Sequence, residues 1–128
     1  MPNTRVETRA GWITSPESVI SAAHSAVAEV LRLPDWDRTI RLVEHAPSHF
    51  PIPPGRGERF TLVEVTLFKG RSIETRRALY KSMVARLEGV GVPASDVTIT
   101  LIEVPAENWG IRGGQMASEV DLGFKVDI

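Results

Sequence analysis

The hydrophobic residues of this chain repeat with two different periods, and each period predicts a different kind of secondary structure. From residue 16 onward the apolar positions fall on one stripe of a helical period, which predicts an amphipathic helix. Ser15 can accept hydrogen bonds from the exposed amides of a helix start, and Pro16 suits the first helical position because it needs no donor there. Proline disfavours helical geometry in the preceding residue, so we expect the helix to end before Pro34. The predicted buried stripe consists of Val19, Ile20, Ala23, Ala26, Val27, Val30 and Leu31.

A second helix is predicted after residue 72. Ser72 is its expected cap, and Gly89 and Gly91 mark its expected end. The predicted buried stripe of this helix consists of Leu79, Tyr80, Met83 and Leu87.

Four other segments are rich in β-branched residues and predict strands. They cover residues 4–8, 39–44, 61–68 and 97–104. Between the second and third of them, residues 46–57 contain several prolines and glycines, which are poor strand formers. This composition predicts a linker.

The chain also matches itself when it is shifted by 59 residues, which indicates a duplicated unit. Each copy has the order strand, helix, strand, and such a unit places its two strands in parallel through a right-handed crossover. We therefore predict a single α+β domain (an α/β sandwich) from residues 1–128, with repeat one at 2–45, a linker at 46–59 and repeat two at 60–128. Pro34, Asp37, Thr39, Ile40, Leu42 and Glu44 recur as Pro93, Asp96, Thr98, Ile99, Leu101 and Glu103.

The two units are expected to share one four-stranded mixed sheet with both helices on a single face. The opposite face of so small a sheet is then expected to expose Val, Ile and Leu. Apolar surface left in water costs roughly 25 cal/mol per Å². Oligomerisation would remove that cost.

Composition narrows the classes of function. The 128 residues include 15 Lys and Arg against 16 Asp and Glu, so the formal net charge is -1, and there is no cysteine. A chain this close to neutral offers no overall attraction to nucleic acid or to an acidic membrane surface. The absence of cysteine excludes disulfides and thiolate nucleophiles and fits a reducing compartment. We expect a cytoplasmic protein that binds neither nucleic acid nor membranes.

The histidines do not predict a metal site. His45 and His49 are four residues apart, but Pro47 between them prevents a regular helix from presenting both side chains. His24 falls where the second copy has Met83, which favours a packed helix position over a ligand role.

The N-terminus carries the most specific chemical hypothesis. The chain begins MPNTRVETRAGWI, with proline directly after the initiator methionine. Removal of Met1 would leave Pro2 with a free secondary amine, a group that no internal residue can supply.

Two further segments lead to a family resemblance. Residues 68–72 read Phe-Lys-Gly-Arg-Ser, and residues 107–118 read Glu-Asn-Trp-Gly-Ile-Arg-Gly-Gly-Gln-Met-Ala-Ser. Together with Pro2 and the duplication, these segments resemble the tautomerase superfamily. The second half is similar to a 4-oxalocrotonate tautomerase subunit, and the whole chain is similar in length to malonate semialdehyde decarboxylase and cis-3-chloroacrylic acid dehalogenase. The resemblance implies a short C-terminal hairpin, a homotrimer and catalysis without a cofactor or metal.

The resemblance also implies roles for individual residues. Pro2 matches the catalytic proline, and Arg71 matches the arginine of the Gly-Arg-Ser segment that binds a substrate carboxylate. Asp37 falls where the decarboxylase and the dehalogenases have an acidic residue near the proline. Lys69 stands where the decarboxylase has an arginine, and Trp109 is expected to form an apolar wall beside the amine. Small carboxylates are the implied substrates.

Three functions stay open at this point. The first is a tautomerase in which Pro2 acts as a base on a 2-oxo acid or an unsaturated acid. The second is a decarboxylase, hydratase or dehalogenase, in which Pro2 works protonated and Asp37 takes part. The third is a family member that keeps the fold and serves as a binding module. Lysine cannot reproduce the planar two-pronged contact of arginine, so Lys69 weakens the match to the decarboxylase.

Overall fold

The fold is built on a four-stranded sheet. The computed structural model describes residues 2–128, and Met1 lies outside the described residues. Along the sheet the strands stand in the order β2-β1-β3-β4. They span Pro2–Arg9 (β1), Ile40–His45 (β2), Thr61–Phe68 (β3) and Val97–Val104 (β4).

The sheet register repeats between the two units. β1 is parallel to β2, and β3 is parallel to β4. Thr4 lies opposite Ile40 in the first unit, and its repeat equivalent Val63 lies opposite Ile99 in the second. The two units therefore have the same internal pairing, as expected for copies of one strand–helix–strand plan.

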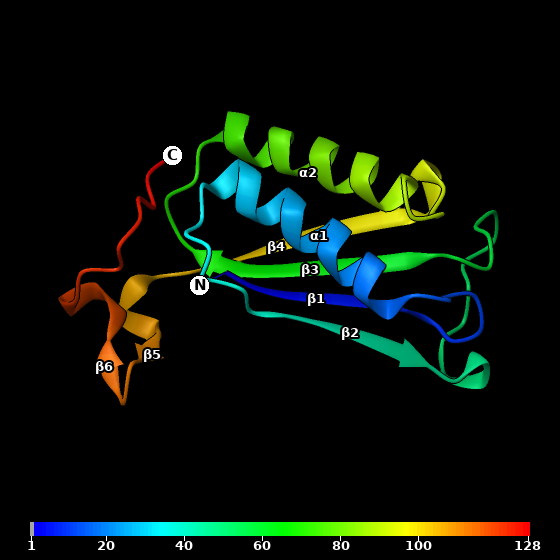
Figure 1. Ribbon diagram of the computed structural model, residues 1–128, viewed down its shortest axis with the longest axis horizontal. Coiled ribbons are helices and arrows are strands. Elements are labelled where there is room, and N and C mark those ends of the chain that lie inside the picture. The colour runs from blue at the N-terminus through cyan, green and yellow to red at the C-terminus, as the bar shows by residue number, and fades with distance from the viewer. Residues whose placement is uncertain (1) are drawn as a thin grey trace.

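The central strands β1 and β3 join the units and run antiparallel. Pro2 lies opposite Leu67, and Thr8 lies opposite Thr61. The sheet therefore has two equivalent ends. We call them the Pro2 end, where β1 and β2 begin and β3 and β4 finish, and the Thr61 end, where the reverse holds. Figure 1 shows the Pro2 end on the left, next to both chain termini.

Two helices cover one face of this sheet (Figure 1). They are α1 (Pro16–Leu31) and α2 (Ile73–Glu88), and both begin at the predicted caps. The Ser15 hydroxyl accepts a hydrogen bond from the amide of Ser18, and the Ser72 hydroxyl accepts one from the amide of Thr75. The predicted fold class, a mixed sheet with both helices on one side, is confirmed.

The core lies between the helices and the sheet. Alternate residues of β1 and β3 face the helices and are buried, which follows from the two-residue period of a strand. The fully buried helix residues are Val19, Ala23, Ala26, Val27 and Leu31 in α1 and Leu79, Met83 and Leu87 in α2.

The predicted helix stripes were too wide. Ile20 and Val30 are only half-buried, and Tyr80 is 38% exposed. Tyr80 lies on the outer side of α2 with Lys81 and Val84 around a shallow cavity. One side of each helix packs on the sheet, and a second side packs on the other helix. Residues at the edge of the predicted stripe therefore stay in contact with solvent.

The outer face of the sheet differs from the predicted apolar surface. Leu62 and Ile102 are exposed there, at 37% and 38%, but most neighbouring positions are polar. Glu7 lies 2.7 Å from the His45 ring nitrogen and 3.5 Å from the Arg5 guanidinium. The outward positions of β1 are Asn3, Arg5, Glu7 and Arg9. A partner that covers this face has to match charges as well as apolar area.

The predicted C-terminal hairpin is also present. β5 (Gly110–Ile111) pairs with β6 (Gln115–Met116) in an antiparallel two-stranded sheet. Arg112 and the two glycines after it have positive φ angles, which suit a tight reversal of the chain. Within residues 2–128, neither helix has the length and apolar character needed to cross a membrane.

Candidate active site

Three of the predicted site residues gather at the Pro2 end because several strand termini meet there. Pro2 is the first residue of β1, and β3 runs antiparallel to it and finishes at Phe68, shortly before Arg71. β2 is parallel to β1, so its start lies at the same end, and Asp37 comes just before that start. Residues far apart in sequence are thus brought to one end of the sheet.

Pro2 occupies a buried position at the start of a central strand. Proline is tolerated at the first residue of a strand, where it interrupts no established ladder. The ladder continues at Thr4, whose amide donates a hydrogen bond to the carbonyl of Thr39 over 3.1 Å. On the other side of β1, Pro2 lies opposite Leu67, which places it beside the end of β3.

Arg71 is buried, with only 3% of its surface exposed. Gly70 before it has a φ of 127°, and this conformation turns the chain from β3 toward α2. One terminal nitrogen, Nη1, donates a hydrogen bond to the carbonyl of Lys125 over 3.0 Å. Neither Nε nor Nη2 has a hydrogen-bond partner among the described residues.

The charge of Arg71 survives this burial. Burial lowers the pKa of the Arg71 guanidinium, and the nearby carboxylate of Asp127 acts in the opposite direction. A guanidinium has so high an ordinary pKa that it stays protonated at neutral pH. The Asp127 carboxylate offsets part of the cost of burying this charge, whereas Nε and Nη2 stay without hydrogen-bond partners among the described residues.

Asp37 is also buried, with 3% of its surface exposed. Its backbone amide donates to the carbonyl of Pro34 over 3.0 Å, which fixes the turn between α1 and β2. Burial and the nearby Arg38 lower the pKa of His24, while the carboxylate of Asp37 acts in the opposite direction. Asp37 thus lies within electrostatic reach of α1 as well as at the Pro2 end.

Trp109 and Lys69 reach the same end of the sheet from outside the core. The Trp109 ring packs on Phe68 with their centroids 4.7 Å apart, and its indole nitrogen donates to the carbonyl of Val104. Phe68 points to the outer face, so Trp109 flanks the Pro2 end on that side. Lys69 is exposed, and its ammonium makes no ion pair with the described residues.

Sequence reasoning missed the last residues of the chain. Gly123, Phe124, Lys125 and Ile128 line a cavity of about 370 Å³ together with Arg32, Leu33 and Pro34. Two of the lining residues contact predicted polar residues: the Lys125 carbonyl accepts a hydrogen bond from Arg71, and the Pro34 carbonyl accepts one from the amide of Asp37. Alternating apolar residues at 122, 124, 126 and 128 were the available signal of an extended, packed segment.

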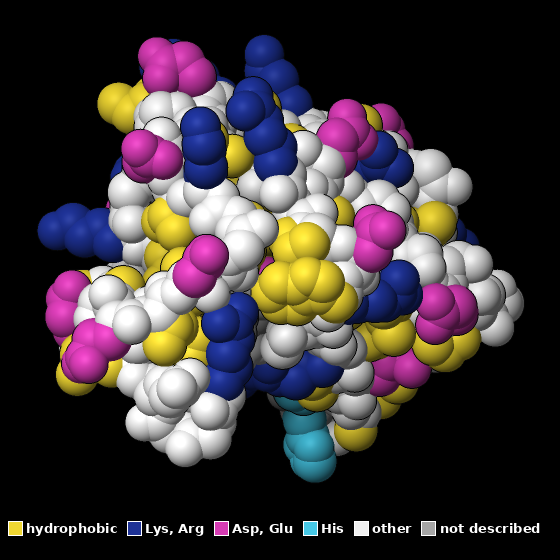
Figure 2. All heavy atoms as spheres, turned by 60° about the vertical axis from the view of Figure 1, so that its left-hand side comes forward, with side chains coloured by type: hydrophobic (Ala, Val, Ile, Leu, Met, Phe, Trp, Pro, Cys, Tyr) yellow, Lys and Arg dark blue, Asp and Glu magenta, His cyan; other side chains and the backbone are white. Residues whose placement is uncertain are grey.

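Figure 2 brings this part of the molecule forward. Lys and Arg side chains lie there among exposed hydrophobic groups, with Asp and Glu interspersed. The surface is mixed in charge, so the buried guanidinium of Arg71, and not a broad positive surface, supplies the local attraction for an anion.

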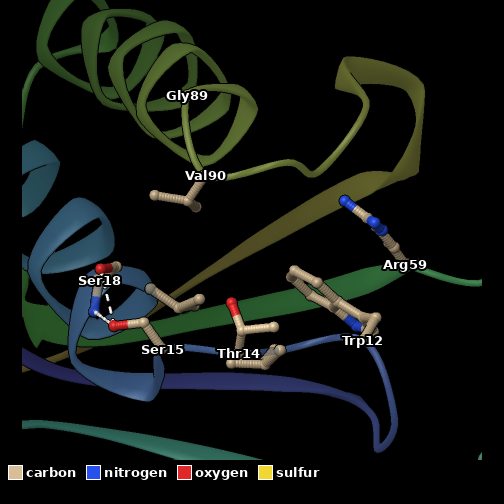
Figure 3. A pocket seen from close by; sticks show the side chains of 9 residues that line it. Trp12, Thr14, Ser15, Ser18, Arg59, Gly89 and Val90 are labelled. Carbon is tan, nitrogen blue, oxygen red and sulfur yellow. Dashed lines mark hydrogen bonds between the residues drawn. The ribbon is translucent and has the colours of Figure 1, made fainter.

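A second cavity of about 370 Å³ lies at the Thr61 end, between the start of α1 and the end of α2. Figure 3 shows that Trp12 and Arg59 point toward it from one side, with Ser15 and Ser18 on the other. The Arg59 guanidinium lies 5.3 Å from the centre of the Trp12 ring, and its Nη1 donates to the carbonyl of Gly91. In contrast to Arg71, Arg59 is exposed.

Within residues 2–128, no group of three or more His, Asp or Glu side chains is arranged to hold a metal ion. His45 pairs with Glu7 and stacks on Phe50 with their ring centroids 5.4 Å apart. These contacts account for the position of His45 in the fold.

Comparison with known proteins identifies the family to which this fused pair of strand–helix–strand units belongs. Residues 37–112 match the family model described as "Tautomerase enzyme". The chain belongs to this family. It is also 40% identical over 53 residues to a probable tautomerase of Ralstonia nicotianae, a match that covers 41% of this chain and 76% of that protein.

Solved structures share the whole architecture. A malonate semialdehyde decarboxylase inhibited by 3-bromopropiolate has a TM-score of 0.78 and 28% identity, and the match covers 89% of this chain and 92% of that one. A symmetric trimer of a fused 4-OT has a TM-score of 0.78 and 23% identity, and covers 90% of this chain and 95% of that one. The second match supports the fold alone.

Proposed function

We propose that this protein is a cofactor-independent tautomerase that uses the amine of Pro2 to move a proton within a small 2-oxo carboxylate. The observation that carries the proposal is the convergence of Pro2, buried Asp37 and buried Arg71 at one end of the sheet. The reaction is a keto–enol or double-bond tautomerisation. It requires removal of Met1, so that the nitrogen of Pro2 is an amine and not an amide.

Arg71 supports the choice of a carboxylate as the bound group. Its Nε and Nη2 are buried and without partners among the described residues, and they form the edge of a guanidinium that contacts both oxygens of a carboxylate. The same positive charge would stabilise the enolate that develops when a proton leaves carbon. Lys69, exposed at the same end, would contribute charge to binding.

Pro2 supplies the proton transfer in this proposal. Burial and a neighbouring cation both disfavour the charged form of an amine, which suits a buried N-terminal proline to act as a base at neutral pH. A neighbouring carboxylate such as Asp37 acts in the opposite direction and suits the protonated form that the second candidate requires. The amine removes a proton from one position of the substrate and returns it to another, with no net change in composition. Trp109, packed on Phe68, would help to keep water from this end of the sheet.

A decarboxylase or hydratase acting on a 3-oxo acid is the second candidate. Asp37, buried at the Pro2 end, and the 28% identity to a malonate semialdehyde decarboxylase favour it. In that reaction Pro2 would act protonated, and Asp37 would orient or activate water. A binding module without turnover is the third candidate, and it predicts no reaction in either assay.

The proposal extends to assembly and location. We infer a homotrimer, supported by the trimeric fused 4-OT of the same fold and by the outer sheet face with its exposed Leu62 and Ile102. A cytoplasmic location fits the chain without cysteine. Small carboxylates are the proposed partners, and neither nucleic acid nor a membrane surface is expected to bind.

The decisive experiment begins with the intact mass of the natively produced protein, which establishes whether Met1 is removed. Turnover is then measured with phenylenolpyruvate and, separately, as carbon dioxide release from malonate semialdehyde. We expect tautomerisation of phenylenolpyruvate, and we expect Pro2→Ala to lower kcat/KM by about 10²- to 10⁴-fold because the general base is lost.

Thr61→Ala is the matched control, because Thr61 is the repeat equivalent of Pro2 at the other end of the sheet. Its turnover should stay within about twofold of the wild-type value, because Thr61 lies at the opposite end of the sheet from the proposed site and distant sites act independently. Full activity of Pro2→Ala, or of a protein that retains Met1, contradicts the mechanism. Carbon dioxide release without tautomerisation selects the second candidate.

A further inference from the structure

The last seven residues of the chain, 122–128, cross the Pro2 end as an extended segment that we call the C-terminal strap. Its first part lies near Trp36 at Gly123, and its last residue reaches the start of α2. Lys125, between these two points, accepts the hydrogen bond from Arg71. The strap therefore runs over the one predicted site residue that carries a buried positive charge.

The hydrogen bonds of Arg71 divide its guanidinium into two halves. Nη1 is held by the Lys125 carbonyl over 3.0 Å, and the Nε–Nη2 edge has no partner among the described residues. A carboxylate binds a guanidinium best through two parallel hydrogen bonds from one edge. The strap thus binds Nη1, which such a contact does not need, and leaves the Nε–Nη2 edge available for the carboxylate.

We propose that the C-terminal strap is a positioning element that fixes the guanidinium of Arg71 so that its Nε–Nη2 edge faces the substrate carboxylate. This inference rests on the proposed function, in which Arg71 binds that carboxylate. The Lys125 carbonyl is the positioning group, and it acts only through Arg71. No side chain of the strap is required to touch the substrate.

The strap is anchored on both sides of Lys125, which makes it fit for this role. The hydroxyls of Ser72, the cap of α2, and Thr75, in its first turn, donate hydrogen bonds to the backbone oxygen of Ile128, the last residue. On the other side, the Phe124 ring lies 6.4 Å from the Phe68 ring, centre to centre. Between these anchors the backbone at residue 125 is fixed relative to the end of β3.

Loss of the strap is expected to release Arg71 without removing it. An arginine side chain has several rotatable bonds. Without the strap, these bonds have to be ordered when the carboxylate binds, and this ordering costs binding free energy. The affinity for a carboxylate should fall, while the groups that move the proton stay in place. The strap also carries Asp127, whose carboxylate acts on the charge of Arg71. If the main effect of the strap were competition by this anion, removal of the strap would instead strengthen binding.

The test measures carboxylate binding without turnover. The full-length protein, a variant that ends after Gly123, Arg71→Ala, and the combination of both changes are titrated with 3-phenylpropanoate in a calorimeter. We expect the shortened protein to bind roughly tenfold more weakly, as expected for loss of a hydrogen bond to a charged group. Arg71→Ala should weaken binding at least as much, and shortening the Arg71→Ala protein should cause no further loss.

Two further variants separate positioning from general destabilisation. Thr75→Val removes one hydrogen bond to the Ile128 carbonyl but keeps the side-chain shape, and it should weaken binding in the same direction by a smaller factor. Arg112→Ala is the matched control, because Arg112 also donates to a carbonyl near the strap, that of Asp121, but lies away from Arg71. Its affinity should be unchanged, and the thermal midpoint of every variant verifies folding.

Unchanged or tighter binding by the folded, shortened protein overturns the proposal. So does a loss of affinity that appears equally when Arg71 is already alanine, because the strap would then act independently of it. The outcome is separate from that of the proposed function. If Pro2→Ala keeps full turnover while the strap variants still lose affinity through Arg71, the proposed mechanism fails and the positioning role stands.

Discussion

The two ends of the sheet are built on the same plan, and they differ in what stands at equivalent positions. At the Pro2 end, the first strand of the first unit begins with proline, next to the initiator methionine in the sequence. At the Thr61 end, the equivalent residue is Thr61, which is preceded by Phe60 inside the chain. Its backbone nitrogen is an amide and cannot act as a base. Fusion of two units therefore leaves room for one terminal amine in each chain.

The two repeat-related aspartates show the same contrast. Asp96, the equivalent of Asp37, accepts hydrogen bonds from the amide of Gly57 at 3.1 and 3.2 Å. Gly57 belongs to the connection between the two units, so this carboxylate ties the connecting segment to the sheet. An aspartate at a loop-to-strand junction often has such a role. Asp37 has the equivalent position in the first unit, just before β2 at the Pro2 end.

The residues that follow the two central strands differ as well. Trp12 stands where the second unit has Arg71, and its indole nitrogen donates to the hydroxyl of Thr8 over 3.0 Å. That donor is satisfied within the chain, whereas two donors of Arg71 have no hydrogen-bond partner among residues 2–128. Both ends have a cavity of about 370 Å³, so cavity volume alone does not separate them. The buried guanidinium of Arg71 distinguishes the Pro2 end from the Thr61 end.

After Pro2 and Thr61, the next largest expected difference between the ends concerns Arg71 and Trp12. Arg71→Ala should raise KM for phenylenolpyruvate by about 10- to 100-fold, because a two-pronged contact with the carboxylate is lost. Trp12→Phe, the matched change at the Thr61 end, should leave KM within about twofold. Steady-state kinetics with both variants checks this. Equal changes in KM for the two variants would mean that the carboxylate does not bind at the Pro2 end through Arg71.

A smaller and qualitatively different contrast is expected for the two aspartates. Asp37→Asn should lower kcat of the decarboxylase or hydratase reaction about tenfold or more, as expected for a group that orients or activates water. Asp96→Asn should leave kcat unchanged and lower the free energy of unfolding by about 1–3 kcal/mol, because the amide of Gly57 loses a charged acceptor. Urea denaturation and kinetics on each variant measure both quantities. A stability loss for Asp37→Asn with unchanged kcat would assign Asp37 a structural role.

The smallest expected effect is a pH dependence of the free energy of unfolding that arises from His24. Burial and Arg38 lower the pKa of His24 below its ordinary value of 6.5 in the folded protein. The unfolded chain then binds more protons in the window below pH 6.5, so stability falls as the pH decreases through that value.

His24→Met places the residue of the second unit at this position and removes the titrating group. The loss of stability between pH 7.5 and 5.5 should be smaller in His24→Met than in the wild-type protein, by denaturation at the two pH values. An identical pH dependence in both proteins would show that other groups determine it.

Much of the fold could be predicted because local patterns agreed with the global arrangement. The strands 61–68 and 97–104 have the predicted bounds, since alternating β-branched residues lie between clear turn signals. β1 is longer than the predicted 4–8, because pairing with β3 extends the strand to Pro2 and pairing with β2 extends it to Arg9. The predictions that Tyr80 is buried and that the outer face of the sheet is apolar were wrong. Side-chain burial depends on which elements pack together, and the sequence pattern does not give this.

The sequence by itself determined the duplication, the strand–helix–strand order and the residue types at Pro2, Asp37 and Arg71. These follow from periodicity, from spacing and from the single proline behind the initiator methionine, which are local properties of the chain. Only the tertiary structure decided that these residues share one end of the sheet and that the C-terminal strap contacts Arg71. The reason is that pairing register and the packing of a distant segment depend on contacts between residues far apart in sequence.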